Sequence, residues 1–442
     1  MKRLVFIITL LAVSIGAVMA QEYDSPEYVS LGREKARSKV VPYPTAEEAQ
    51  RLGAGAVASK YLRPVKNWTR TEEADAVVFT SKYVIPFVWL SRQAILYVDE
   101  ASGAYEVLIN GKKVGYSANA FTPAEFNITK ASKEEANTIS IRVLKNHFSR
   151  KMECYNERTD YHVGEVYVMS QPMIRVRDVV HTTHVDMHSE TAKVELGLVV
   201  KTETLNPKKA RIHYELVAPD TTVVTYGHRD IELGMRQEDT IKFMANIPYA
   251  LTWCAEMPVR YRLNIKPQIE GRYQEYQSHM IGFRTVAVNE DGDFLINGIK
   301  TELFYRDFDP LTVTDKDIVA ARVLKYNALR FKMGAVPQNV YRMCDSLGMY
   351  VIAQIPINTK NSGISRRVGG NPSNDPKWKN AYLDRVETSY RTTRGQACVI
   401  GYIMAEESSN GINLYESYLK LKRWESTRPV IYLDAVEEWN SD

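Results

Sequence analysis

Cysteine is scarce in this chain of 442 residues, and its four copies lie far apart. Cys154, Cys254, Cys344 and Cys398 have none of the short spacings that mark zinc sites or small disulfide-bonded domains. Cys344 and Cys398 fall inside apolar patterns, which predicts buried thiols. The spacing therefore gives no support to a metal centre built on cysteine.

Charge of one sign and long apolar runs are also lacking. The 57 Lys and Arg residues against 53 Asp and Glu leave a net charge of +4, too small an excess to indicate nucleic acid or an anionic membrane surface. Beyond residues 4–18, no segment is apolar over enough length to span a bilayer. We therefore expect neither a nucleic-acid partner nor a membrane span.

The apolar run at residues 4–18 belongs to an expected signal peptide, residues 1–20. Lys2 and Arg3 precede it, and a small-residue cleavage site ends at Ala20. No cysteine stands at the cleavage point, so we expect no lipid anchor. This pattern predicts an exported protein, periplasmic or secreted, that is cleaved after Ala20.

The remaining composition is that of an ordinary globular protein. Hydrophobic residues make up 45% of the chain and charged residues 25%, and the length suffices for two to four domains. The 27 Tyr and 6 Trp suit sugar stacking, but they suit β-sandwich cores equally well.

Short alternating strands indicate two β domains in the first two thirds of the chain. Residues 21–70 carry no sustained period and are predicted to form an N-terminal arm. In residues 71–172, strands at 94–98 and 105–109 lead into the turn Asn110-Gly111, a strong hairpin signal that favours a jelly-roll β-sandwich. About seven strands in residues 173–286 predict an immunoglobulin-like β-sandwich, one of whose strands is expected to end at Pro267.

The period changes in residues 287–442 to strands that alternate with helices. Pro337 is expected to open a helix that Gly348 closes, and Thr314 with Asp317 resembles a capping box. Further strands are expected at 328–333, 349–353, 398–404 and 429–433. The fold class is thus multidomain β plus α/β, ending in a parallel (β/α) TIM-type barrel.

Two adjacent carboxylates, Glu406 and Glu407, follow the apolar strand at 398–404. The carboxyl ends of barrel strands hold the active sites of such folds, so these acids are candidates for catalysis. An acid before a helix also interacts favourably with the helix dipole, which offers an alternative explanation. The stretch by itself leaves both open.

Several stretches in the same order resemble family-2 glycoside hydrolases of the β-galactosidase branch. They are residues 37–49, 109–117, 122–129, 253–258, 294–298, 345–352 and 427–430. The resemblance implies hydrolysis of O-glycosidic bonds in carbohydrates by a retaining mechanism, with one carboxylate as acid/base and another as nucleophile. A β-galactoside-like carbohydrate is the implied partner.

The family's residues carry over only where the sequence matches. Its Gly-Asn-Glu-Ser pattern stands here as Ala405-Glu406-Glu407-Ser408, so Glu407 matches the acid/base. Glu406 takes the place of the asparagine that holds the sugar, and an adjacent carboxylate is expected to perturb the proton donor. Asn110 matches a substrate-contacting asparagine of the jelly roll.

The other barrel motifs of the family depart from its pattern. Asp307 and Asp309 fall where family members place metal ligands and are candidates to hold Mg²⁺ with Glu407, although a solvated acidic turn explains them too. The histidine expected after residue 330 and the acid expected after residue 353 are missing.

Residues 287–442 contain about five of eight (β/α) units, and a whole barrel takes about 250 residues. The family's nucleophile follows the seventh strand, and no acid here matches it. Three hypotheses follow: a truncated and inactive or impaired glycosidase, a non-catalytic carbohydrate-binding or scaffold remnant, and the N-terminal half of a split enzyme. A homo-oligomer or a complementing chain is then expected to cover the open edge of the sheet.

Overall fold

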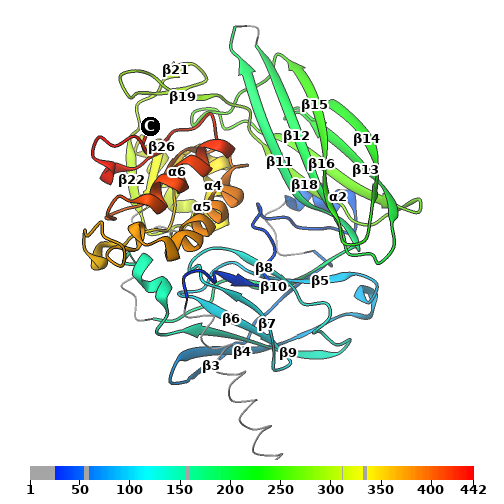
Figure 1. The fold of residues 1–442 in the computed structure, drawn as a ribbon. Coiled ribbons are helices and arrows are strands. Elements are labelled where there is room, and N and C mark those ends of the chain that lie inside the picture. The colour runs from blue at the N-terminus through cyan, green and yellow to red at the C-terminus, as the bar shows by residue number, and fades with distance from the viewer. Residues whose placement is uncertain (1–24, 54–58, 156–159, 189, 311, 332–335) are drawn as a thin grey trace, which may run out of the picture.

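The structure is a computed structural model that describes residues 25–53, 59–155, 160–188, 190–310, 312–331 and 336–442. The expected signal peptide lies outside the described residues. Three units are arranged around a common centre, with two β-sandwiches and a parallel α/β unit (Figure 1). No helix in the described ranges has both the length and the apolar character needed to cross a bilayer.

The first unit is a sandwich of two antiparallel sheets around one apolar core. The larger sheet has the order β1 (Ser30–Leu31), β7 (Lys112–Ser117), β6 (Tyr105–Ile109), β9 (Ala136–Leu144), β4 (Ala76–Val84), β3 (Thr69–Glu72). The smaller sheet has the order β2 (Leu62–Pro64), β10 (Val166–Gln171), β5 (Gln93–Val98), β8 (Ala124–Asn127). The short helices are α2 (Ala46–Leu52), η2 (Phe87–Trp89) and η3 (Phe148–Met152).

The predicted hairpin joins β6 and β7. Asn110 and Gly111 both have positive φ, 51° and 78°, as a type I′ turn requires. The strands predicted at 94–98 and 105–109 are confirmed as β5 and β6. The expected arm contributes short strands to the jelly roll, because β1 and β2 within it, and β3 at its end, pair with jelly-roll strands. Two- to four-residue strands are too short for their pattern to be recognised in the sequence.

The second unit is an immunoglobulin-like sandwich. One sheet has the order β11 (Ile174–Asp186), β12 (Thr191–Thr202), β15 (Glu238–Pro248). The other contains β14 (Val223–Leu233), β13 (Lys208–Val217), β16 (Tyr261–Ile269), β17 (Arg272–Tyr273) and β18 (Gln277–Ile281). A small sheet of β19 (Val286–Val288), β20 (Phe294–Ile296) and β21 (Ile299–Lys300) leads into the third unit.

The prediction that a strand ends at Pro267 is wrong, because β16 continues to Ile269. Pro267 pairs with Ile212 on one side. On its other side it lies between the stretch that pairs with β18 and the stretch that pairs with β17. A proline has no backbone N–H to donate to a neighbouring strand. At this position neither β17 nor β18 pairs with the residue, so the missing donor costs no ladder hydrogen bond.

The third unit is a sheet of five parallel strands covered by helices, the fold class expected for a (β/α) barrel. The strands run in the order β22 (Tyr305–Phe308), β23 (Ala328–Phe331), β24 (Tyr350–Gln354), β25 (Val399–Ile403), β26 (Val430–Ile431). The helices are α3 (Asp315–Val323), α4 (Gln338–Leu347), α5 (Lys379–Thr393) and α6 (Ile412–Trp424), with the short η4 (Lys360–Ser362), η5 (Pro372–Asn374), η6 (Pro376–Trp378) and η7 (Leu433–Ala435).

The helix signals of the sequence are confirmed in this unit. Thr314 and Asp317 form a reciprocal capping box at α3, and Pro337 caps α4. Gly348 ends α4 with φ of 74°, and a Cβ there would lie 2.1 Å from the Ala255 carbonyl oxygen. The thiols of Cys344 and Cys398 are fully buried, as predicted, within the core of this unit.

Candidate active site

The candidate site lies at the carboxyl ends of β24 and β25, where a loop of the jelly roll meets the parallel sheet. Asn358 connects the two sides, because it forms parallel bridges with Glu153 and with Glu406. The Asn358 N–H donates to the Met152 carbonyl oxygen (2.8 Å), and the Cys154 N–H donates to the Asn358 carbonyl oxygen (3.1 Å). The backbone of the jelly-roll loop thus pairs with the segment at Asn358, which in turn pairs with the segment at Glu406.

Glu407 projects from this ladder into solvent, with 61% of its side chain exposed and φ at 44°. Asn358 Nδ2 donates to Glu407 Oε2 (3.0 Å), and Lys360 Nζ lies 3.5 Å from the same oxygen. The Asn358 hydrogen bond, with help from Lys360, lowers the pKa of Glu407. The carboxylate is therefore held ionised near neutral pH, whereas a general acid needs a raised pKa.

Glu406 has the opposite environment. It is half-buried, and burial raises its pKa. The charges of Glu407 and Asp434 raise the pKa further, while a hydrogen bond with Gln354 and the charge of Arg330 oppose them. Of the two carboxyl groups, Glu406 is the one that its surroundings favour in the protonated form.

The loop after Glu407 is held by buried polar contacts. Ser408 Oγ accepts from the Thr359 N–H (3.1 Å), and the Ser408 N–H donates to Asp434 Oδ2 (3.1 Å). Helix α6 begins only at Ile412, and no acid lies in its first turn. The helix-dipole explanation for the two acids therefore finds no support.

A buried ion pair fixes the jelly-roll loop to the barrel helices. Arg385 Nη2 donates to Glu153 Oε1 (2.8 Å), and the two side chains are 1% and 2% exposed. Arg385 Nη1 also donates to the Pro356 carbonyl oxygen (3.1 Å), two residues before Asn358. Burial alone would lower the pKa of Arg385, and Glu153 raises it above its ordinary value. The pair thus positions Asn358, and through it Glu407.

Sequence reasoning missed Asn358 and Arg385 and gave Glu153 no role. A charged residue within the apolar stripe of α5 was an available signal for Arg385, which lies between the buried Tyr382 and Val386. Asn358 had no such signal, because its role depends on a contact between two domains.

Asn110 is placed by its own hairpin and has no contact with Glu407 in the described structure. Its Nδ2 donates to Asn137 Oδ1 (2.9 Å) and to the Ala131 carbonyl oxygen (3.0 Å), and its Oδ1 accepts from the Thr138 N–H (3.0 Å). These contacts explain Asn110 as a turn residue. Its predicted contact with substrate stays a prediction.

Asp307, one of the two predicted magnesium ligands, is engaged by an arginine, and the magnesium site with Asp309 stays a prediction. Asp307 binds Arg330 through both carboxylate oxygens (2.7 and 3.0 Å), so a cation from the chain already neutralises it. Within the described ranges, no three His, Cys, Asp or Glu side chains gather as a metal site.

Comparison with known proteins agrees with this architecture. Residues 16–179 match the model for the sugar binding domain of glycosyl hydrolases family 2. Residues 174–284 match a second model of glycosyl hydrolases family 2, and residues 292–441 match its TIM barrel domain. The three matches follow one another along nearly the whole chain. The chain belongs to glycoside hydrolase family 2.

Curated relatives of this family-2 chain include two bacterial proteins named beta-galactosidase. The protein from Priestia megaterium is 27% identical over 433 residues, which cover 93% of this chain and 39% of the relative. The protein from Yersinia enterocolitica is 27% identical over 366 residues, 78% of this chain and 34% of the relative. The chain thus spans between a third and two fifths of the length of these relatives.

Solved structures of similar fold include a beta-glucuronidase from Bacteroides uniformis, with a TM-score of 0.70 and 17% identity over 90% of this chain and 52% of that one. A putative beta-galactosidase from Bacteroides fragilis has a TM-score of 0.68 and 14% identity, over 82% of this chain and 56% of that one. At these identities the likeness shows the fold alone.

Proposed function

We propose that this family-2 chain binds a β-galactoside-like carbohydrate and supplies the acid/base part of a glycosidase site that acts on O-glycosidic bonds. The observation that carries the proposal is the position of Glu407. It lies in the Ala405-Glu406-Glu407-Ser408 stretch at the carboxyl end of β25, and Asn358 holds its carboxylate (3.0 Å). The residue thus faces solvent where a substrate has access.

Retaining hydrolysis needs a second carboxylate about 5 Å from the proton donor. Glu406 is adjacent in the chain, and we assign no nucleophile to the described residues. The lowered pKa of Glu407 further disfavours proton donation in the sugar-free state. We therefore expect the chain alone to bind sugar with little or no turnover, and a complementing chain to supply the nucleophile.

Glu406 is a second candidate for the proton donor. Its raised pKa is the property that a general acid requires, and the neighbouring negative charge of Glu407 maintains it. In this arrangement Glu407 would bind the sugar and Glu406 would hold the proton. The residue pair, rather than Glu407 alone, then forms the acidic half of the site.

Binding and turnover are measured separately. Isothermal titration of the pure chain with galactose and with an aryl β-galactoside is expected to show saturable binding that Glu407→Gln weakens at least tenfold. The release of nitrophenol from the aryl β-galactoside is expected to stay at the level of the buffer. Rapid turnover that Glu407→Gln abolishes would overturn the expectation that the chain alone is inactive. Absence of binding to both sugars would overturn the proposed carbohydrate binding.

A matched aryl β-glucuronide tests the sugar class, because the fold is shared with a glucuronidase. The positions of Glu406 and Glu407 predict that this anionic sugar binds more weakly than the galactoside, since like charges repel.

The expected signal peptide adds the proposal that the protein is exported. Sequencing the N-terminus of protein from the periplasm or the medium tests this proposal, and Gln21 is the expected first residue.

A further inference from the structure

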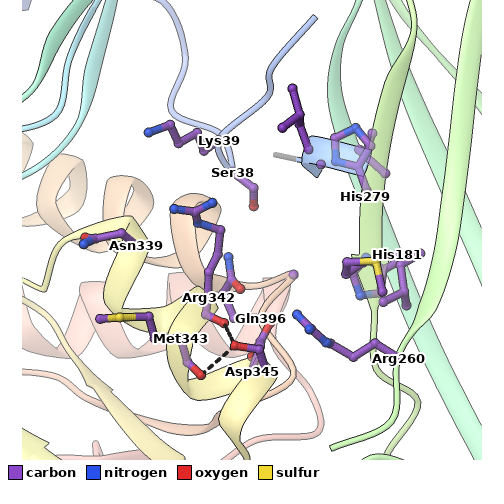
Figure 2. A pocket seen from close by; sticks show the side chains of 17 residues that line it. Ser38, Lys39, His181, Arg260, His279, Asn339, Arg342, Met343, Asp345 and Gln396 are labelled. Carbon is purple, nitrogen blue, oxygen red and sulfur yellow. Dashed lines mark hydrogen bonds between the residues drawn. The ribbon is translucent and has the colours of Figure 1, made fainter. Parts of the chain in front are cut away.

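A cavity of about 460 Å³ lies where the N-terminal arm, the immunoglobulin-like sandwich and the barrel helices meet. Ser38 comes from the arm, His181 from β11, and Arg342 from α4 (Figure 2). Gln396, which also lines it, precedes β25, whereas Glu407 follows that strand. The cavity and the candidate active site therefore lie at opposite ends of the same strand.

Two guanidinium groups approach this cavity from facing elements. Figure 2 shows Arg342 extending from α4 toward Ser38, and Arg260 extending from the sandwich side toward Gln396. Among the described residues, neither side chain has a hydrogen bond or an ion pair, and Arg342 Nε is buried without an acceptor. Burial lowers the pKa of Arg260, and the charge of Asp345 opposes this effect without cancelling it.

The other charged groups of the lining are already engaged. Lys39 Nζ pairs with Glu165 (2.9 Å). Asp345 is the sole carboxylate among the described lining residues, and its Oδ1 accepts from the Cys398 N–H (2.7 Å). Burial raises the pKa of Asp345, which weakens its ability to balance a nearby cation. The cavity therefore carries an excess of positive charge.

Two uncharged imidazoles line the cavity, and one of them can add a hydrogen-bond donor. Burial, with the arginines around it, lowers the pKa of His181 to about 3, and burial lowers the pKa of His279 to about 4. Both rings are thus neutral near pH 7 and keep one N–H each. The N–H of His279 lies on Nε2 and donates to Gln277 Oε1 (3.2 Å), so of the two rings His181 is the one that can offer a donor to a ligand. Two guanidinium groups together with one neutral donor suit the oxygens of a phosphate or sulfate group, which accept several hydrogen bonds at once.

We propose that this cavity is an oxyanion-binding site for a phosphate or sulfate group, free or carried on a small organic molecule. The site is independent of the proposed sugar-binding function. A bound oxyanion would join Arg342 of the barrel to Arg260 of the sandwich and remove the cost of two poorly compensated charges. Binding to the folded state alone stabilises it by mass action, so the unfolding temperature is expected to rise.

Calorimetric titration of the full chain with inorganic phosphate, and separately with sulfate, tests the site. We expect one saturable site per chain in a buffer whose ionic strength is held constant with NaCl. Arg260→Gln and Arg342→Gln are each expected to weaken binding at least tenfold. Arg211→Gln is the matched control, because Arg211 is an exposed arginine of the sandwich paired with Asp230, and it is expected to leave affinity unchanged.

The same titration with galactose 6-phosphate distinguishes a free ion from a phosphate on an organic body, because the cavity exceeds the size of the ion. Glu407→Gln must leave oxyanion affinity unchanged, which separates failure of this proposal from failure of sugar binding. Arg342→Lys keeps the charge if Arg342→Gln does not fold, and it is expected to retain part of the affinity.

Three results would overturn the proposal. One is absence of saturable heat up to 20 mM phosphate and sulfate. Another is equal affinity in the Arg260 and Arg342 variants and the parent. The third is an unfolding temperature that rises with concentration without saturation and equally in all variants, since excluded salts stabilise any folded protein in that way.

Discussion

The two ends of the parallel sheet contact different β domains and use charge in opposite ways. At the carboxyl ends the jelly-roll loop meets Glu406 and Glu407, which are partly or largely exposed. At the amino end of β25 the sandwich contributes Arg284, whose guanidinium donates to the carbonyl oxygens of Gln396, Ala397 and Val399. One interface presents acids to solvent, and the other buries cations against backbone.

The two interfaces differ in whether their charged side chains already have partners within the protein. Arg284 is committed to three carbonyl groups, and Arg428 is committed to Glu425 and the Arg394 carbonyl oxygen. At the carboxyl ends, by contrast, the carboxylates of Glu406 and Glu407 are partly or largely open to solvent. Near the sandwich interface, Arg260 and Arg342 differ from Arg284 and Arg428, because within the described ranges their side chains form no hydrogen bond or ion pair.

Breaking the buried ion pair at the jelly-roll interface is expected to have the largest effect. Arg385→Met leaves Glu153 as an uncompensated buried charge, which destabilises the fold by about 3–5 kcal/mol. The change in the free energy of unfolding is measured by denaturant titration monitored through tryptophan fluorescence. The double variant Glu153→Leu with Arg385→Met is expected to recover much of the loss. If Arg385→Met costs no more than Arg211→Met at an exposed pair, the interface is not held by this contact.

Glu425, near the sandwich interface, is expected to make the stability of the fold depend on pH in the acidic range. Burial raises its pKa, but Arg428 outweighs this and lowers it to about 2. A depressed folded-state pKa gives stability that is present above about pH 4.5 and is lost as the pH falls toward 2, about 3 kcal/mol in all. Unfolding temperatures from pH 7 to pH 3 measure this loss. Glu425→Gln should flatten the profile, and an equal acid slope in both proteins would contradict the assignment.

At the candidate site, the order of the two carboxyl pKa values sharpens the comparison. We expect the pKa of Glu407 to lie below the ordinary glutamate value and the pKa of Glu406 to lie above it. Carbon-13 titration of labelled glutamates measures both values, and the Glu406→Gln and Glu407→Gln variants assign the two signals. Asn358→Ala should raise the pKa of Glu407, because it removes a hydrogen bond to the charged form. Asn380→Ala serves as control, because the Asn380 side chain donates to the Glu27 carbonyl oxygen instead. A reversed order would remove the argument for Glu406 as the protonated partner.

The smallest effect is expected at the pair of Asp307 and Arg330. Both side chains are substantially exposed, so Asp307→Asn should change the free energy of unfolding by less than about 1 kcal/mol. Millimolar Mg²⁺ should not shift the unfolding temperature of the parent, since Arg330 occupies the Asp307 carboxylate. A magnesium-dependent shift that Asp307→Asn removes would restore the metal prediction.

Local signals accounted for those features in which a few neighbouring residues decide the outcome. Asn110-Gly111 specified a turn because both residues tolerate positive φ, and Pro337 with Gly348 marked the ends of α4. Pro267 showed the limit of such reasoning, because its effect depends on whether a partner strand lies beside it. The sequence also placed Glu406 and Glu407 after a strand, but it did not show which of them is exposed.

By itself the sequence determined the order of three units and the position of two acids at the end of β25, because hydrophobic periodicity and turn chemistry are local properties. Only the tertiary structure decided that Asn358 binds Glu407, that Glu153 and Arg385 support this contact, and that Arg330 neutralises Asp307. These contacts join residues 23 to 232 positions apart. Their energies depend on burial and on neighbouring charge, which arise only when the domains pack together.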